Sequence, residues 1–255
     1  MTLETRNTFL ILGLFISALV VLAACIGLTY IYLKGILPGS MPAVLPPLAL
    51  SLVSSVAALL IYLSFRKTLS AEITLFIVFL VLTSLDILKP GGLVIRFYQG
   101  PLSWSITLTR IVYLFRFSGI FCFMSAGLFA AGLPSQRLSI TLGICFFLAF
   151  LFSLILPIDS SIREDNFILR VGLHSEIQTG MIILEIIAVV NYIIALGKTG
   201  EKALLLTTLG AALTISGREI LFFQQGLLIA IPAFIFFCVG ILLYAKKIHQ
   251  IYLWK

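Results

Sequence analysis

The sequence predicts an all-α, polytopic transmembrane helical bundle of about eight helices, forming a single integral membrane domain over residues 1–255. Hydrophobic residues make up 61% of the chain and charged residues only 11%, whereas roughly 25% of the residues in soluble domains are charged. Long apolar segments recur along the chain, each near the ~20 residues that a helix needs to cross the hydrocarbon core. The predicted helices cover residues 8–33, 44–64, 71–88, 104–133, 138–156, 176–196, 203–223 and 227–245.

The first predicted helix has an alternative interpretation as a signal segment. The tetrapeptide LAAC, which ends at Cys25, has the small-residue pattern that precedes a lipid-modified cysteine in bacterial lipoproteins. The apolar sequence continues to Leu33, however, and the apolar cores of signal peptides are only ~7–15 residues long. We therefore expect a retained first helix. Cleavage would leave seven helices with the amino end outside.

The other helices are bounded by proline, glycine and basic residues. Pro46 and Pro47 fall in the first turn of the second helix, where a missing N–H does no harm. Pro90 follows the third helix and ends it. The seventh helix differs from the rest because two adjacent charges, Arg218 and Glu219, interrupt its apolar sequence.

Lysine and arginine are distributed unequally between the two sides of the predicted bundle. The side with both chain ends has nine, namely Arg6, Arg66, Lys67, Arg137, Lys198, Lys202, Lys246, Lys247 and Lys255. The other side has six, namely Lys34, Lys89, Arg96, Arg163, Arg170 and Arg218. Because the basic excess faces the cytoplasm, we expect both termini there and the protein in the cell (inner) membrane of a bacterium. These residues lie singly between helices, so the net charge of +7 indicates a lipid bilayer as neighbour and not nucleic acid.

The fourth helix carries two arginines inside its apolar sequence, Arg110 and Arg116. An arginine in hydrocarbon costs at least ~2.5–3.5 kcal/mol, so it normally faces protein or water and has a partner. At about 100° per residue, Arg110, Tyr113 and Arg116 fall on one arc about 120° wide. We expect that arc to face the inside of the bundle and to meet acceptors on neighbouring helices.

Glu185 in the sixth helix is the expected partner of Arg116, because depth counted at about 1.5 Å per residue places both near the middle of the bilayer. A carboxylate and a guanidinium can bind fork to fork. Together they would form the floor of a pocket that opens to the outside, while the inner half of the bundle is predicted to be mostly apolar. The rim is predicted to consist of Asp86, Arg110, Arg218 and Glu219. The candidate ligand-binding residues are thus Asp86, Arg110, Tyr113, Arg116, Glu185, Arg218 and Glu219.

The sequence lacks the motifs that indicate an enzyme, including HExxH, the GxSxG elbow and a Gly-rich phosphate loop. The four cysteines lie inside apolar segments without a CxxC motif or a nearby histidine cluster. They are therefore predicted to be structural thiols and not metal ligands or a disulfide framework. We expect no catalytic site, no metal and no cofactor.

Two interpretations of the intramembrane charges remain open. In the first, the charges pair only to fix helix packing. In the second, they line a pocket for a small polar or anionic ligand. The second predicts a sensor or receptor that acts through a membrane or cytoplasmic protein partner, because the sequence contains no output domain. In topology, predicted helices two to eight resemble bacterial seven-helix sensor regions. The alternatives are a small-solute transporter that uses the same pocket and a structural subunit of a membrane complex.

Overall fold

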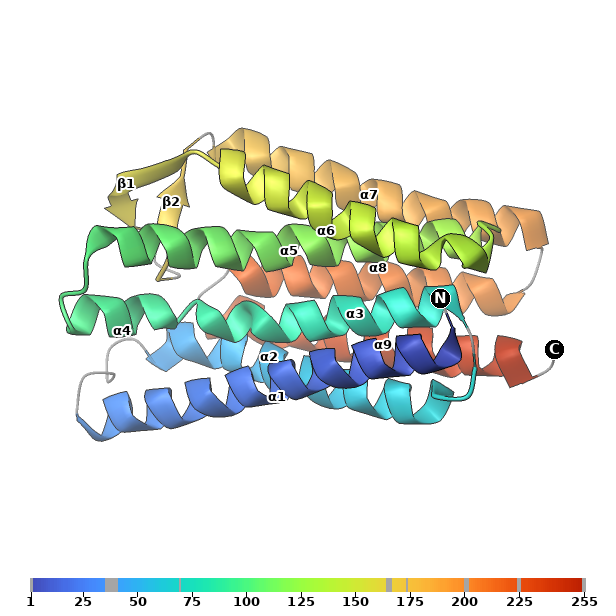
Figure 1. Ribbon diagram of the computed structural model, residues 1–255, viewed down its shortest axis with the longest axis horizontal. Coiled ribbons are helices and arrows are strands. Elements are labelled where there is room, and N and C mark those ends of the chain that lie inside the picture. Colours follow the sequence, from blue (N-terminus) through green and yellow to red (C-terminus); the bar gives the residue numbers. More distant parts are fainter. Residues whose placement is uncertain are drawn as a thin grey trace.

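The computed structural model describes residues 2–34, 41–68, 70–163, 167–172, 174–199, 202–223 and 226–253. Within these ranges, eight helical spans are long and apolar enough to cross a membrane. The chain is therefore a multi-pass, all-α membrane bundle, as the sequence predicted. The start of the first helix and the end of the last lie at the same end of the bundle (Figure 1), as an even number of crossings requires.

Helices α1 (Leu3–Leu33) and α2 (Met41–Phe65) form one side of the bundle. Helix α1 is continuous through Cys25, and most of its large apolar side chains are exposed, as a lipid-facing helix requires. Its inward face carries Ser17, whose hydroxyl lies 2.9 Å from that of Ser55 on α2 and 2.5 Å from that of Ser84. Small hydroxyl side chains at this junction let the helices approach closely and bond to one another.

Arg6 is buried and does not lie at the surface as an orientation charge, which corrects its sequence-based assignment. Its guanidinium donates hydrogen bonds to the carbonyls of Phe65 at 3.3 Å and Arg66 at 2.8 Å, and also to the carbonyl of Thr68. The Phe65 carbonyl belongs to the last turn of α2, where helical C=O groups have no partner within the helix, and the other two carbonyls follow directly after it. Arg6 therefore closes the end of α2.

Helix α3 (Ala71–Ser84) is the central helix, and all of its residues are buried. A helix that is apolar all round belongs inside a bundle, and α3 follows that rule. The single helix predicted over 71–88 is wrong at its end. After Ser84 the chain tightens into the 3₁₀ turn η1 (Leu85–Leu88), and a short helix α4 (Gly91–Phe97) follows Pro90. Pro90 has no N–H to donate, so it breaks the helix here.

Helix α5 (Leu102–Ala130) packs against α3, and α6 (Leu138–Ile155) packs on its outer side after the 3₁₀ turn η2 (Ser135–Arg137). Many of the large apolar side chains of α6 are exposed, so α6 belongs to the lipid-facing periphery. Helix α5, in contrast, is largely buried from Arg116 to Gly127. Its middle therefore forms part of the core of the bundle.

A β-hairpin that the sequence did not predict connects α6 to α7. Strand β1 (Ile158–Arg163) pairs antiparallel with β2 (Leu169–Val171). The hairpin lies at the end of the bundle opposite the chain termini, beside the start of α5 (Figure 1). The backbone N–H of Leu169 donates to the Thr109 hydroxyl at 3.1 Å, which fixes the hairpin to α5.

Helices α7 (His174–Thr199), α8 (Lys202–Phe223) and α9 (Leu227–Leu253) complete the bundle. Helices α8 and α9 pack backbone against backbone. A Cβ built on Gly217 would lie 2.6 Å from the Ala233 carbonyl oxygen, and one on Gly240 would lie 2.5 Å from the backbone nitrogen of Thr214. Small residues are what such close packing requires.

Replacing Gly240 with alanine is expected to destabilise the protein by ~1–3 kcal/mol, because the added methyl group overlaps the backbone of α8. Unfolding in mild detergent, followed by circular dichroism, measures this loss. Gly143→Ala in α6 is the matched control, since a Cβ at Gly143 meets no atom within 4 Å. Equal stability of the two variants would contradict the close packing of α8 on α9.

Candidate functional site

Six ionisable side chains gather inside the bundle, where η1, α5, α7 and α8 meet. We call them the charge cluster, and they are Asp86, Lys89, Arg116, Glu185, Arg218 and Glu219. Electrostatic interactions connect the members across all four elements. The formal charges balance, with three cations against three carboxyl groups.

The cluster is enclosed by protein. Arg116 and Arg218 have 0% of their surface exposed and Asp86 has 1%, while the Glu219 side chain, at 12%, is the most accessible member. Removing a charge from water costs several kcal/mol unless partners offset the loss. The cluster residues must therefore compensate one another, and the contacts below show how far they do so.

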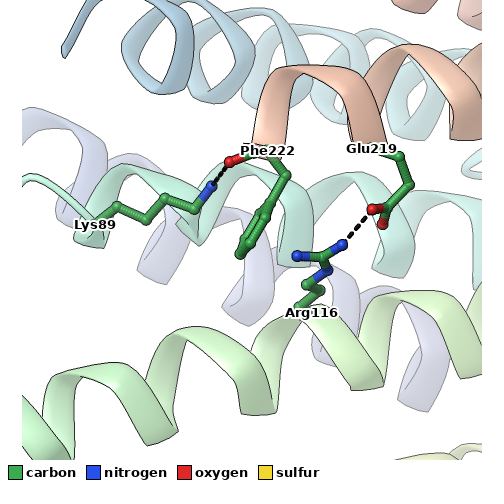
Figure 2. A network of polar contacts seen from close by, with 4 residues as sticks. All are labelled: Lys89, Arg116, Glu219 and Phe222. Carbon is green, nitrogen blue, oxygen red and sulfur yellow. Dashed lines mark hydrogen bonds and ion pairs between the residues drawn. The ribbon is translucent and has the colours of Figure 1, made fainter. Parts of the chain in front are cut away.

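Arg116 forms its ion pair with Glu219, to which its Nη2 donates (Figure 2). The predicted pairing of Arg116 with Glu185 is therefore wrong. The reason is the unequal reach of the helices. Glu219 lies one turn before the end of α8. From Arg116 back to its first residue, Leu102, α5 extends roughly 20 Å at about 1.5 Å per residue. The last turn of α8 is consequently level with the middle of α5, and the two predicted layers of charge merge into one.

Glu185 reaches the cluster from α7 and lies beside Glu219. The two carboxyl groups are within hydrogen-bonding reach of each other, and Arg116 and Arg218 both act on Glu185 electrostatically. Glu185 and Tyr192, two turns apart, are both buried, so this face of α7 points into the bundle. Glu185 thus belongs to the site, although its direct neighbour differs from the predicted one.

Lys89 is the cluster member that sequence reasoning missed, because it was assigned to the outer surface as an orientation charge. It is buried, and its Nζ donates to the Phe222 carbonyl at 3.1 Å. This carbonyl belongs to the last turn of α8, so the ammonium group caps that helix. The Phe222 ring lies between two cations (Figure 2), with its centre 3.0 Å from Lys89 Nζ and 3.6 Å from Arg116 Cζ. Its position three residues after Asp86 was the sequence signal that could have identified Lys89 as a site residue.

Arg218 is the least satisfied member. None of its three guanidinium nitrogens has a hydrogen-bond partner among the residues that the structure describes, and the same holds for Nε and Nη1 of Arg116. Arg218 lies against Gly119 of α5, where an added Cβ would come within 3.4 Å of Nη2, and its Cζ is 5.3 Å from the centre of the Phe79 ring. The glycine leaves the space that the guanidinium occupies.

Acceptor groups of the cluster are also incompletely used. Both carboxylate oxygens of Asp86, Oε1 of Glu185 and Oε1 of Glu219 have no partner within the described part of the chain. Buried polar atoms in proteins are almost always hydrogen-bonded. The cluster therefore contains unused acceptors as well as unused donors.

The structure does not bring every predicted site residue together. Asp86, Arg116, Glu185, Arg218 and Glu219 meet in the cluster as described above. Tyr113 is buried, and its ring centre lies 5.9 Å from Arg116 Cζ, so it borders the site. Arg110 is exposed and lies outside the cluster. The arc predicted on α5 was too wide. Tyr113 and Arg116 face the inside of the bundle, whereas Arg110 does not.

A second polar group lies deeper along the bundle, which corrects the expectation of a mostly apolar inner half. Tyr244 of α9 donates to Glu72 Oε1 at 3.1 Å, and its hydroxyl lies 2.6 Å from that of Tyr192. All three side chains are buried. We call Glu72, Tyr192 and Tyr244 the inner triad.

An aromatic layer separates the charge cluster from the inner triad. The ring of Phe79 lies 4.8 Å from that of Phe123, and Phe76 lies 3.9 Å from the ring of Tyr244, measured between centres. Phe79 also faces Arg218. Buried polar groups are thus stacked in two layers along the bundle, with phenylalanine rings between them.

An apolar cleft and the cysteines lie outside the charge cluster and the inner triad. A cleft of about 500 Å³ between α5, α6 and α7 is lined by apolar side chains with Glu176 at its edge, and no cluster residue lines it. Among the described residues, no three His, Cys, Asp or Glu side chains gather as metal ligands would. Cys122 and Cys145 are buried free thiols, and Cys25 and Cys238 are half-buried ones.

No protein family, curated protein or solved structure matches the chain.

Proposed function

We propose that the chain is a non-enzymatic multi-pass protein of the cell (inner) membrane that binds a small oxyanion, or a polar solute with such a group, in the charge cluster. The observation that carries the proposal is Arg218, which is fully buried although none of its nitrogens has a partner among the described residues. Arg116 adds two further unbonded nitrogens beside it. Intramembrane ionisable residues mark binding sites and solute pathways more often than not.

The chemistry of the donors favours a carboxylate, phosphate or sulfate group. The planar guanidinium fork matches two oxygens of such a group and binds them in parallel. An oxyanion would give the unused nitrogens of Arg116 and Arg218 acceptors in a site shielded from water. Unpaired buried donors cost roughly 1–3 kcal/mol each, so their satisfaction supplies binding energy.

A receptor role follows from the enclosure of the site. A ligand can enter the cluster only if helices move, and an anion that binds one arrangement of the bundle more tightly would shift the protein toward it. Such a shift could be passed to a membrane or cytoplasmic protein partner. This role keeps the sensor-like interpretation and assigns the ligand to the cluster.

A transporter is the second candidate, and the inner triad favours it. Buried polar groups continue from the charge cluster to Glu72 and the two tyrosines, whereas a receptor pocket needs no polar group on the inner side. The aromatic layer would then act as the barrier between the two polar layers. Receptor and transporter share the same binding site and differ only in whether the solute leaves on the other side.

Titration calorimetry of the protein in lipid nanodiscs, in chloride-free buffer, tests the binding site with acetate, nitrate and sulfate as probes. We expect at least one probe to bind to the wild-type protein. Arg218→Gln should weaken that binding roughly 10- to 100-fold, as the loss of charge-assisted hydrogen bonds implies. Arg110→Gln is the matched control on the exposed face of α5 and should leave binding unchanged. Binding that is equal in all three proteins would contradict the proposed site.

Uptake into proteoliposomes separates the two candidates. Uptake of a labelled probe that Arg218→Gln abolishes would establish a transporter. Binding without uptake would support the receptor. Neither binding nor uptake, together with copurification of other membrane proteins at fixed stoichiometry, would instead indicate a structural subunit.

A further inference from the structure

Glu185 of α7 and Glu219 of α8 are neighbouring members of the charge cluster, and their carboxyl groups interact across the interface of the two helices. Two carboxyl groups can share a hydrogen bond only when one of them carries a proton, because a carboxylate has acceptors but no donor. Glu219 accepts from Arg116 through Oε2. Glu185 forms no such ion pair within the described residues, so it is the better placed of the two carboxyl groups to hold a proton.

The charged groups that face Glu185 come from both helices packed against α7. Helix α5 contributes Arg116, and helix α8 contributes Arg218 and Glu219. Lys89 also acts electrostatically on Glu219. On α7 itself, Tyr192 is the titratable side chain on the same face, two turns away and within the inner triad.

The charge of the cluster decides whether an anion is accepted. With a proton on Glu185, three cations face two carboxylates, and one bound monoanion makes the site neutral. With both glutamates ionised, the empty cluster is already neutral, and a bound anion leaves an excess negative charge away from water. Excess buried charge is strongly unfavourable. The protonated pair is thus the form of the site that is ready to bind.

We propose that the charge cluster binds a small oxyanion together with one proton, and that the Glu185–Glu219 pair holds this proton. The inference rests on the proposed anion site and adds the ion that accompanies the ligand. Because two ligands that stabilise the same state promote each other's binding, affinity for the anion must rise as the pH falls. In a transporter the same pair would couple solute movement to a proton gradient.

The pH dependence of acetate binding to the wild-type protein in nanodiscs tests the proposal. Between pH 6 and 9 acetate keeps its charge, so changes in Kd report on the protein. We expect Kd to rise with pH, by at most tenfold per pH unit, which is the limit for one linked proton. At a single pH, the binding heat should differ between two buffers of unlike ionisation enthalpy, which shows proton uptake without any variant.

Glu185→Gln assigns the effect to the pair, because an amide keeps a donor for Glu219 but cannot titrate. We expect this variant to bind acetate with no pH dependence, whereas Glu176→Gln, at the exposed start of α7, should keep the wild-type slope. Acetate binding that is independent of pH and of buffer would overturn this proposal and leave the anion site standing. A wild-type slope retained in Glu185→Gln would also overturn it and would place the proton on another member of the cluster. Absence of binding by acetate, nitrate and sulfate at every pH would overturn the anion site and this proposal together.

Discussion

Replacing Arg116 with alanine is expected to lower the free energy of unfolding by ~3–5 kcal/mol, because it leaves Glu219 as an uncompensated charge inside the bundle. Equilibrium unfolding in mixed detergent micelles measures the loss. The Arg116→Ala, Glu219→Ala double variant should recover part of it, since the stranded carboxylate is then removed as well. Arg116→Ala combined with Glu185→Ala should recover less, because Glu185 is not the ion-pair partner.

Arg110→Ala is the control for this series. It removes the same kind of side chain from the same helix at an exposed position, and we expect a change of less than ~0.5 kcal/mol. Better recovery by the Glu185 double variant than by the Glu219 double variant would restore the pairing predicted from helix depth and contradict the contact in Figure 2.

Replacing Lys89 with methionine is expected to cost ~2–4 kcal/mol in stability, because it removes the cap of α8 and a cation that interacts with Asp86. Methionine keeps most of the volume of the lysine stem, so the loss reports on the charge and its hydrogen bond. The same unfolding experiment measures it, and hydrogen exchange should rise in the last turn of α8. Lys89→Met with Asp86→Asn should recover part of the stability.

Lys34→Met provides the comparison for Lys89. Lys34 also follows the end of a helix, but it is exposed. Its replacement should change stability by less than ~0.5 kcal/mol. Equal effects at Lys34 and Lys89 would show that Lys89 acts as an ordinary surface lysine.

The membrane spans could be predicted because apolar length is a local property of the sequence. The helix predicted over 138–156 and the observed α6 (Leu138–Ile155) agree at both ends, since Pro134 and Pro157 mark the turns. The 3₁₀ turn after Ser84 could not be predicted from composition, because LDIL continues the apolar sequence. Only Pro90 indicates that the helix ends nearby. The hairpin after α6 depends on its contact with Thr109 of a distant helix, which no local pattern reports.

Most of the candidate site could be predicted because a charged residue in an apolar helix needs charged or polar partners within the bundle. That rule selected Arg116, Glu185, Arg218 and Glu219, which the structure brings together. It did not supply the pairing, because the partner of Arg116 depends on how far α8 extends relative to α5. It misplaced Lys89, since a lysine beside Pro90 resembles a loop residue until the neighbouring carbonyl of Phe222 is known.

Anomalous diffraction from crystals grown with selenate tests the anion site most directly, because selenium marks the position of a sulfate-like ion among oxygen and nitrogen atoms. We predict an anomalous peak inside the bundle with selenate oxygens within about 3 Å of Arg218 and Arg116 guanidinium nitrogens, absent from Arg218→Gln crystals. A fully occupied ion pair between Arg218 and a carboxylate, with no selenium at the charge cluster, would contradict it.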